Sequence, residues 1–367
     1  MPSSAEPAPP FSYQSEPARP ESDGFQSQDR DHKGDSYPPS SRPDSNLFQS
    51  HHHHEHKGEL ASPPSRQFPV PYSEEQYFRW PYYRSLFQDA FSEFFGVMIL
   101  VVFGDGAGAQ VTLSDKQKGD YQSIAWGWAI GVTLGFYVAR KSGGHVNPAI
   151  TLANCVYRRF PWRRFPVYLV AQFLGGMVGA AIVYGNYRSA IDHFEGGRGI
   201  RTVTGDTATA SIFATYPQPF MTRTGMFFSE FINSAILQFV IFALLDNGMG
   251  EFFPLALFLL IFGIGAAWGY ETGYAINLAR DFGPRLVSYM IGYGPQVWSA
   301  GGYYFWIPIV APFCGTLFGG FLYDVFLYTG RESPMNTAYM GFTRFLKPRR
   351  SVWSNTYANE RERGSNA

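Results

Sequence analysis

Apolar residues gather in the middle of the 367-residue chain. Residues 1–80 are rich in Ser, Pro, Asp, Glu and His and lack the apolar periodicity that a packed core requires, which predicts a disordered tail. An α-helix needs about 20 mostly apolar residues to cross a bilayer. Segments of this kind follow one another at 88–106, 121–139, 165–185, 225–245, 253–269 and 303–328. The pattern predicts an all-α membrane protein with six transmembrane helices.

A short polar stretch occurs twice within this apolar region. It reads GGHVNPAITL at 143–152 and GYAINLARDFG at 273–283. Asn147 followed by Pro148 is typical of a helix start, because Asn caps free N–H groups and Pro needs none at the first helical position. Irregular backbone at membrane depth must be buried in protein or line a water-filled cavity. The two copies therefore predict two short re-entrant helices, about 147–157 and 277–289, whose N-termini point into a pore.

The two halves of the chain repeat one another. Glu93 and Glu230 each lie in a Ser-Glu-Phe tripeptide early in a span, and each half continues with a span, an Asn-led short helix and a further span. Because three spans is an odd number, the second half must be inverted in the membrane, and inverted repeats bring discontinuous helices together near the midplane. We expect both Glu side chains to accept hydrogen bonds from the turns that precede the two Asn residues. They would then support the pore rather than conduct.

Basic residues predict the orientation. Arg140, Lys141 and the loop YRRFPWRR at 157–164 follow the ends of spans, and Lys and Arg are in excess in cytoplasmic loops. We therefore expect both termini in the cytoplasm and a multi-pass protein, most naturally of the plasma membrane. The predicted parts are a cytoplasmic tail at 1–80, a channel domain at 81–335 and a cytoplasmic tail at 336–367.

Composition excludes several other classes. The formal net charge is zero, so no nucleic-acid partner is implied. Cys155 and Cys314 lie in apolar segments and indicate neither a disulfide framework nor a metal site. The run His51–His54 with His56 could bind a metal ion, but we interpret it as low complexity in a tail. The sequence offers no nucleophile–base pair or phosphate loop, so we expect no enzyme activity, cofactor or metal.

The stretches SGGHVNPAIT and GYAINLARDFGPR resemble the paired signature of the aquaporin/major intrinsic protein family, specifically its glycerol-conducting branch in fungi. Pro308-Ile309 in the sixth span also resembles that branch. The resemblance implies an aquaporin-like fold in a lipid bilayer and a passive channel for glycerol, small polyols and some water that excludes protons and ions. It also implies a homotetramer with one pore per subunit.

The expected pore midplane consists of the two Asn residues and their neighbours. Each helix N-terminus carries about half a positive charge, so two facing N-termini would oppose any cation, including a hydrated proton. A less specific interpretation is that both Asn residues only cap helices in a packed core. The expected midplane residues are Asn147, Pro148, Ala149, Asn277, Leu278 and Ala279. Carbonyls of Gly143, Gly144, His145, Gly273 and Ala275 are expected along the pore. Leu278 replaces the usual Pro of the family, but Leu is a good helix former, so the helix should start normally.

The resemblance also implies an outer filter. Arg280 would donate hydrogen bonds there, with Tyr274, Gly265 and a Trp as the other walls. Trp128 is favoured and Trp126 is the alternative. Two side chains that are two positions apart on a helix cannot both face the pore, so only one of them is expected in the filter. Gly265 stands where water-selective members have a bulky His and leaves room for a carbon chain. Asp281 and Arg285 are spaced i, i+4 and can pair as structural support.

Rival hypotheses remain at this point. A water-selective channel on the same fold is disfavoured by Gly265 and Asp281. An ion-coupled transporter also uses inverted repeats and broken helices, but it needs an ionisable group at the midplane. A structural or signalling protein without a working pore is a further alternative.

Overall fold

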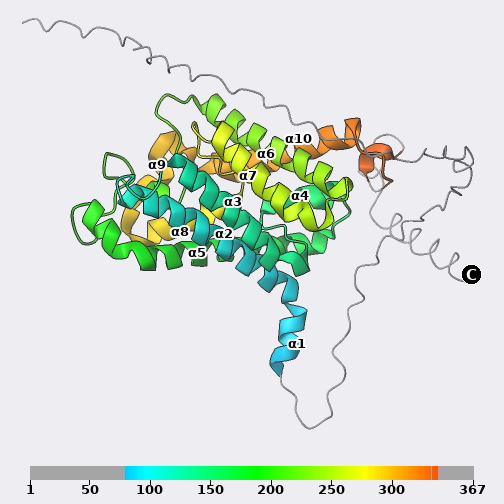
Figure 1. Ribbon diagram of the computed structural model, residues 1–367, viewed down its shortest axis with the longest axis horizontal. Coiled ribbons are helices and arrows are strands. Elements are labelled where there is room, and N and C mark those ends of the chain that lie inside the picture. Colours follow the sequence, from blue (N-terminus) through cyan, green and yellow to red (C-terminus); the bar gives the residue numbers. More distant parts are fainter. Residues whose placement is uncertain (1–78, 332, 338–367) are drawn as a thin grey trace, which may run out of the picture. The chain divides into compact units, whose positions relative to one another are not determined.

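The structure is a computed structural model that describes residues 79–331 and 333–337. The predicted disordered tail up to residue 78, its His51–His56 run and residues 338–367 lie outside the described residues. Within the described ranges every regular element is a helix, as Figure 1 shows. The first helix, α1 (Arg79–Leu86), begins just before the boundary predicted for the channel domain.

The described bundle contains long helices and two short Asn-led ones in the predicted order. The long helices are α2 (Gln88–Leu113), α3 (Tyr121–Val138), α5 (Phe165–Phe194), α6 (Arg223–Asp246), α7 (Phe253–Trp268) and α10 (Ile307–Phe326). The short ones are α4 (Pro148–Tyr157) and α8 (Leu278–Ser288), and a further short helix, α9 (Gln296–Tyr303), precedes α10. Single turns of 3₁₀-helix lie at Arg140–Ser142, Trp162–Arg164, Ala210–Ile212, Gly250–Phe252, Tyr304–Trp306 and Pro334–Asn336, and a π-turn lies at Tyr289–Tyr293.

Among the described residues, five segments are long and apolar enough to cross a membrane, and they contain α2, α5, α6, α7 and α10. The remaining predicted span, α3, is 18 residues long. At about 1.5 Å per residue this length approaches the hydrocarbon thickness of a bilayer. Its first turn carries Gln122 and Ser123, which lowers its average apolarity, and it packs against α2 and α7 in the same bundle. This predicted span is therefore present as a helix of the same bundle but is less apolar than the other five.

Two helices extend further than the apolar pattern predicts. Helix α2 continues to Leu113 rather than residue 106, and α5 continues to Phe194 rather than residue 185. The polar end of α5 is stabilised by the loop that follows, because Asp192 accepts a hydrogen bond of 2.8 Å from Arg201. A hydropathy pattern marks the apolar part of a helix and misses ends that are stabilised by polar contacts.

Close glycine packing joins the helices within each half. On α5, a methyl group at Gly175 would overlap the carbonyl oxygen of Phe94 on α2. On α10, a methyl group at Gly315 would overlap the carbonyl oxygen of Phe231 on α6. Phe94 and Phe231 are the matched residues of the two Ser-Glu-Phe tripeptides, so the contact is repeated in both halves. Each pair therefore holds its glutamate-bearing helix at the shortest distance that backbones allow.

This contact predicts a position-specific cost on α5. Gly175→Ala should destabilise the protein by about 1–3 kcal/mol, since the added methyl group forces backbones apart in a packed interface. Thermal unfolding of the purified protein in detergent would measure the change. Gly185→Ala is the matched control on the same helix, because a methyl group there meets nothing within 4 Å. Equal melting temperatures for the two variants would contradict the packing described here.

Candidate functional site

The carboxylate of Glu93 organises the turn before α4. It is fully buried and accepts hydrogen bonds from the backbone N–H groups of His145 (3.0 Å) and Val146 (2.7 Å). It also accepts them from the hydroxyl of Ser142 (2.6 Å) and the amide of Gln172 (2.7 Å). Four donors converge on one carboxylate, so charge-assisted hydrogen bonds fix the turn from behind.

Glu230 does the same for the turn before α8. Its buried carboxylate accepts hydrogen bonds from the backbone N–H groups of Ala275 (3.0 Å) and Ile276 (2.9 Å). The hydroxyls of Thr272 (2.7 Å) and Tyr304 (3.2 Å) donate to it as well. The two turns are therefore held by equivalent contacts from the two halves of the chain.

Both turns adopt left-handed backbone angles at matched positions. Gly143 and Gly273 have φ of 105° and 83°, which glycine adopts at little cost. Val146 and Ile276 have φ of 42° and 44°, which is unfavourable for β-branched residues. Such conformations persist where the surroundings enforce them. The N–H groups of Val146 and Ile276 are the ones that donate to Glu93 and Glu230, so the carboxylates supply that enforcement.

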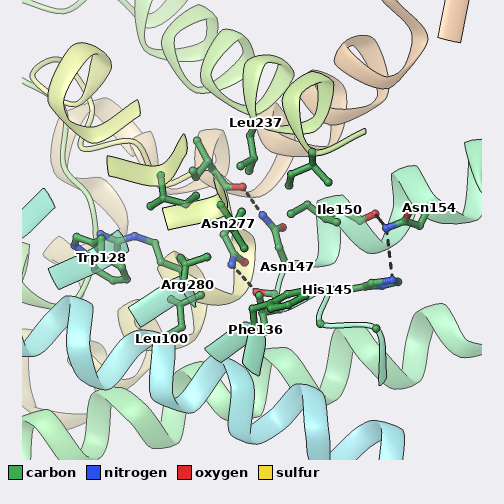
Figure 2. Close-up of a pocket in the computed structure, with 18 of the residues that line it drawn as sticks. Leu100, Trp128, Phe136, His145, Asn147, Ile150, Asn154, Leu237, Asn277 and Arg280 are labelled. Atoms are coloured by element: carbon green, nitrogen blue, oxygen red, sulfur yellow. Dashed lines mark hydrogen bonds between the residues drawn. The ribbon is translucent and has the colours of Figure 1, made fainter. Parts of the chain in front are cut away.

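Asn147 and Asn277 join the two turns directly, as Figure 2 shows. The Asn147 amide donates to the carbonyl of Ile276 (2.9 Å), and the Asn277 amide donates to the carbonyl of Val146 (2.8 Å). Each Asn oxygen accepts a hydrogen bond from the backbone N–H of its own helix, from Ala149 at 2.9 Å or Ala279 at 3.0 Å. Because an amide nitrogen carries two hydrogens, each Asn retains one donor beyond this reciprocal pair.

A cavity passes both Asn residues. Its apolar lining comes from Leu100, Val132, Phe136, Ile150, Leu237, Ile241, Leu245, Phe253, Leu257 and Ile261. Its polar and turn residues are Trp128, Gly143, Gly144, His145, Val146, Asn147, Asn154, Tyr274, Ala275, Ile276, Asn277 and Arg280. The cavity therefore has an apolar wall, mostly from the long helices, and a wall of backbone and amide groups from the two turns.

Arg280 and Trp128 meet at one end of this cavity (Figure 2). The guanidinium carbon lies 3.8 Å from the centre of the indole ring, a cation–π contact. Trp128 is 5% exposed, whereas Trp126 is 48% exposed and packs on Phe258 and Phe262. Of the two Trp residues considered from the sequence, Trp128 is thus the one that borders the cavity with Arg280.

Gly265 lies behind the aromatic wall rather than on the cavity lining. A methyl group at Gly265 would lie 2.8 Å from the Cζ and hydroxyl oxygen of Tyr274 and 3.2 Å from Ala125. The hydroxyl of Tyr121 also donates to the Gly265 carbonyl at 3.0 Å. The space that glycine leaves is occupied by the phenol of Tyr274, so Gly265 acts on the cavity through that ring.

The remaining predicted residues lie close behind the lining. Pro148, Ala149, Leu278 and Ala279 form the first turns of the short helices, and Leu278 starts α8 without a Pro. Neither they nor Gly273 border the cavity. Of the carbonyl residues predicted from the sequence, Gly143, Gly144, His145 and Ala275 do border it.

Asp281 and Arg285 pair on α8 and hold the loop that follows α5. Arg285 contacts Asp281 at 2.9 Å, and both side chains are buried. Asp281 accepts from the backbone N–H of Thr215 (2.7 Å), and Arg285 donates to the Thr215 carbonyl (2.6 Å). The pair thereby fixes this loop against the helix that carries Arg280.

Sequence reasoning missed Asp105 on α2. This residue is fully buried, and neither of its carboxylate oxygens has a hydrogen-bond partner among the described residues. Glu93 was noticed as an acid inside an apolar span, and the same is true of Asp105. Asp105, however, does not belong to a motif that is repeated in the other half of the chain, as Glu93 does.

The hydrogen bonds to Glu230 predict a cost for neutralising it. Glu230→Gln keeps one carbonyl oxygen but turns an NH₂ group toward the N–H of Ile276, so we expect a loss of about 1.5–3 kcal/mol for a hydrogen bond to a charged group. The melting temperature and the solute flux should both decrease. Glu251→Gln, at an exposed site, is the control. An unchanged melting temperature for Glu230→Gln would show that the turn does not depend on this charge.

Comparisons with known proteins give the family. The model of the family described as Major intrinsic protein matches residues 82–323. The probable aquaglyceroporin-2 of Gibberella zeae is 68% identical over 297 residues, which cover 80% of this chain and 88% of that protein. Aquaglyceroporin-9 of Botryotinia fuckeliana is 62% identical over 270 residues, which cover 73% and 59% of the two chains. The X-ray structure of the aquaglyceroporin from Plasmodium falciparum matches with a TM-score of 0.59 and 31% identity, covering 66% of this chain and 97% of that one. This chain belongs to the major intrinsic protein family.

Proposed function

We propose that this protein is a passive membrane channel for glycerol and other small neutral solutes, with some water. The observation that carries the proposal is the cavity, which runs past the N-termini of both short helices and ends at Arg280. The relatives named aquaglyceroporins, at 68% and 62% identity, support the same solute class.

The two walls of the cavity suit a polyol. The carbon chain of glycerol would lie against the apolar side chains of the long helices. Its hydroxyls would accept from the free hydrogens of Asn147 and Asn277 and donate to carbonyls such as those of Gly144 and Ala275. Each solute hydroxyl can thus exchange water for protein partners while the carbon chain remains in apolar contact.

Charge exclusion follows from the same arrangement. Each of the two helix N-termini carries about half a positive charge, and they meet where Asn147 and Asn277 bond across the midplane. Arg280 adds a full positive charge at the end of the cavity. A cation or hydrated proton would meet this field in a medium that screens it poorly, whereas a neutral solute would not.

We assign Trp128, Tyr274 and Arg280 to the outer filter. Gly265 leaves the space that the Tyr274 ring occupies. At 3.8 Å the guanidinium and the indole are in van der Waals contact, so no solute fits between them in this arrangement. The two groups therefore form one continuous part of the filter wall.

Two rival functions make different demands. A water-selective channel would pass water but not glycerol, and the relatives named aquaglyceroporins support the polyol instead. An ion-coupled transporter would need a titratable group facing its substrate. Glu93 and Glu230 are not part of the cavity lining and accept four hydrogen bonds each. His145 does border the cavity, but its ring nitrogens are engaged by Thr151 and Asn154. Uptake that saturates and follows a pH gradient would favour the transporter.

Orientation, membrane and assembly complete the proposal. The basic residues Arg140, Lys141, Arg158 and Arg159 support a cytoplasmic position for that end of the bundle and for both termini. We propose the plasma membrane as the location and a homotetramer, one pore per subunit, as the assembly. Cross-linking in native membranes would test the assembly.

The test is stopped-flow light scattering of proteoliposomes in gradients of glycerol, larger polyols and an impermeant sugar. Glycerol should enter faster than in protein-free vesicles, and permeability should fall as the polyol lengthens. Rapid water flux with glycerol entry equal to that of protein-free vesicles would refute the proposed solute class.

The contact between the Tyr274 ring and Gly265 gives a more specific prediction. Gly265→Ala places a methyl group 2.8 Å from the Tyr274 ring and should displace it into the path. Glycerol permeability should fall by about tenfold, the scale of one methyl group in a specific pocket. Gly263→Ala on the same helix is the matched control, because its methyl group meets nothing within 4 Å. Equal glycerol permeability in the two variants would exclude this role for Gly265.

A further inference from the structure

The hydroxyl of Tyr121 ties the start of α3 to the end of α7. It donates to the carbonyl of Gly265 at 3.0 Å. The same carbonyl accepts the backbone N–H of Gly269 at 3.2 Å, so both of its lone pairs are used. A methyl group at Gly269 would overlap the Tyr121 hydroxyl, which means that the two helix ends meet as closely as glycine allows. Tyr121 is not part of the cavity lining, so its effect on a solute is exerted through other residues.

Backbone hydrogen bonds continue from this contact to the aromatic wall of the cavity. The carbonyl of Gly269 accepts the N–H of Gly273 at 3.0 Å, and Gly273, with φ of 83°, directly precedes Tyr274. The Tyr274 ring then returns to the same place. A methyl group at Gly265 would lie 2.8 Å from the ring carbon Cζ, and one at Gly269 would lie 2.7 Å from Cδ1. Tyr121 therefore holds the short backbone segment that fixes where the Tyr274 ring lies.

One face of α3 supports the outer filter as a whole. Tyr121, Ala125 and Trp128 are spaced i, i+4, i+7 and lie on the same side of the helix. The methyl group of Ala125 would lie 3.2 Å from one added at Gly265. Trp128 carries the guanidinium of Arg280 at 3.8 Å. Tyr121 is the member of this face that fixes its distance from α7 by a hydrogen bond.

The first turn of α3 is itself held by a capping box. The side chain of Asp120 accepts the N–H of Ser123 at 3.1 Å, and the Ser123 hydroxyl accepts the N–H of Asp120 at 3.2 Å. Tyr121 is the first residue of the helix and lies inside this box. The cap therefore places the Tyr121 ring, and the ring places the end of α7.

We propose that Tyr121 is a positioning residue that sets the size selectivity of the outer filter. Its hydrogen bond favours the arrangement in which the Tyr274 ring lies against Gly265 and forms one side of the path. Without that bond, arrangements in which the ring lies farther from the path are populated more, and these admit longer polyols. This role rests on the proposed function, since it requires Tyr274 to border the path of a solute.

The test measures the permeability of glycerol and of a longer polyol, ribitol, in the same proteoliposomes by stopped-flow light scattering. Tyr121→Phe removes the hydroxyl and keeps the ring. The ratio of ribitol to glycerol permeability should rise about fivefold, the factor that corresponds to one neutral hydrogen bond, while glycerol permeability stays within about twofold of the parent. Tyr137→Phe is the matched control, the same substitution at an exposed position of the same helix. A merely structural role would lower the melting temperature and leave the ratio unchanged.

A second variant reaches the same contact from outside it. Asp120→Ala removes the cap that places Tyr121 and should raise the ratio by a similar factor, about fivefold for the loss of a helix cap. In a protein that already carries Tyr121→Phe it should add nothing, because both changes act through one contact. An unchanged ratio in either single variant, or a further rise in the double variant, would overturn the proposal. Parent vesicles that conduct no glycerol would refute the proposed function instead.

Discussion

Two helix ends that meet in the middle of a membrane protein leave backbone N–H groups with no water to satisfy them, and the structure is arranged around this constraint. Each half solves it first within itself, because Glu93 and Glu230 collect the donors of their own turns. The halves then solve it together through the reciprocal bonds of Asn147 and Asn277. What these bonds leave unused, one amide hydrogen on each Asn and the carbonyls of the turns, is what a passing solute can use.

One of the differences between the two turns, at a matched position, gives the path its direction. In the first turn the position is Gly144, where a methyl group would lie 2.5 Å from Phe136. In the second turn it is Tyr274, whose phenol fills the space beside Gly265. The same backbone geometry therefore carries no side chain in one half and a large aromatic ring in the other. The second turn, next to Arg280, is the one that contributes an aromatic ring, and Trp128 of the first half contributes the other.

The sequence was sufficient for the architecture and for part of the site. Apolar segment lengths and the duplicated Asn stretch predicted the helix order, and the family resemblance reduced the filter Trp to Trp128, which was favoured, or Trp126. Burial then separated Trp128 from Trp126. The packing of the Tyr274 ring against Gly265 could not be predicted, because it is a contact between α7 and a turn that are far apart in the sequence. Leu113 and Phe194, the ends of α2 and α5, were also missed, since hydropathy does not register polar contacts such as that of Asp192 with Arg201.

The charged groups around the start of α8 follow from the same constraint. A loop must be held over this end of the path, and the buried pair of Asp281 and Arg285 does so through Thr215. That pair is neutral as a unit, so it adds rigidity without adding a field. Arg280 is different, because it must keep donors free for a solute and therefore cannot be consumed by a close ion pair. Its buried Nη1 accordingly has no hydrogen-bond partner among the described residues.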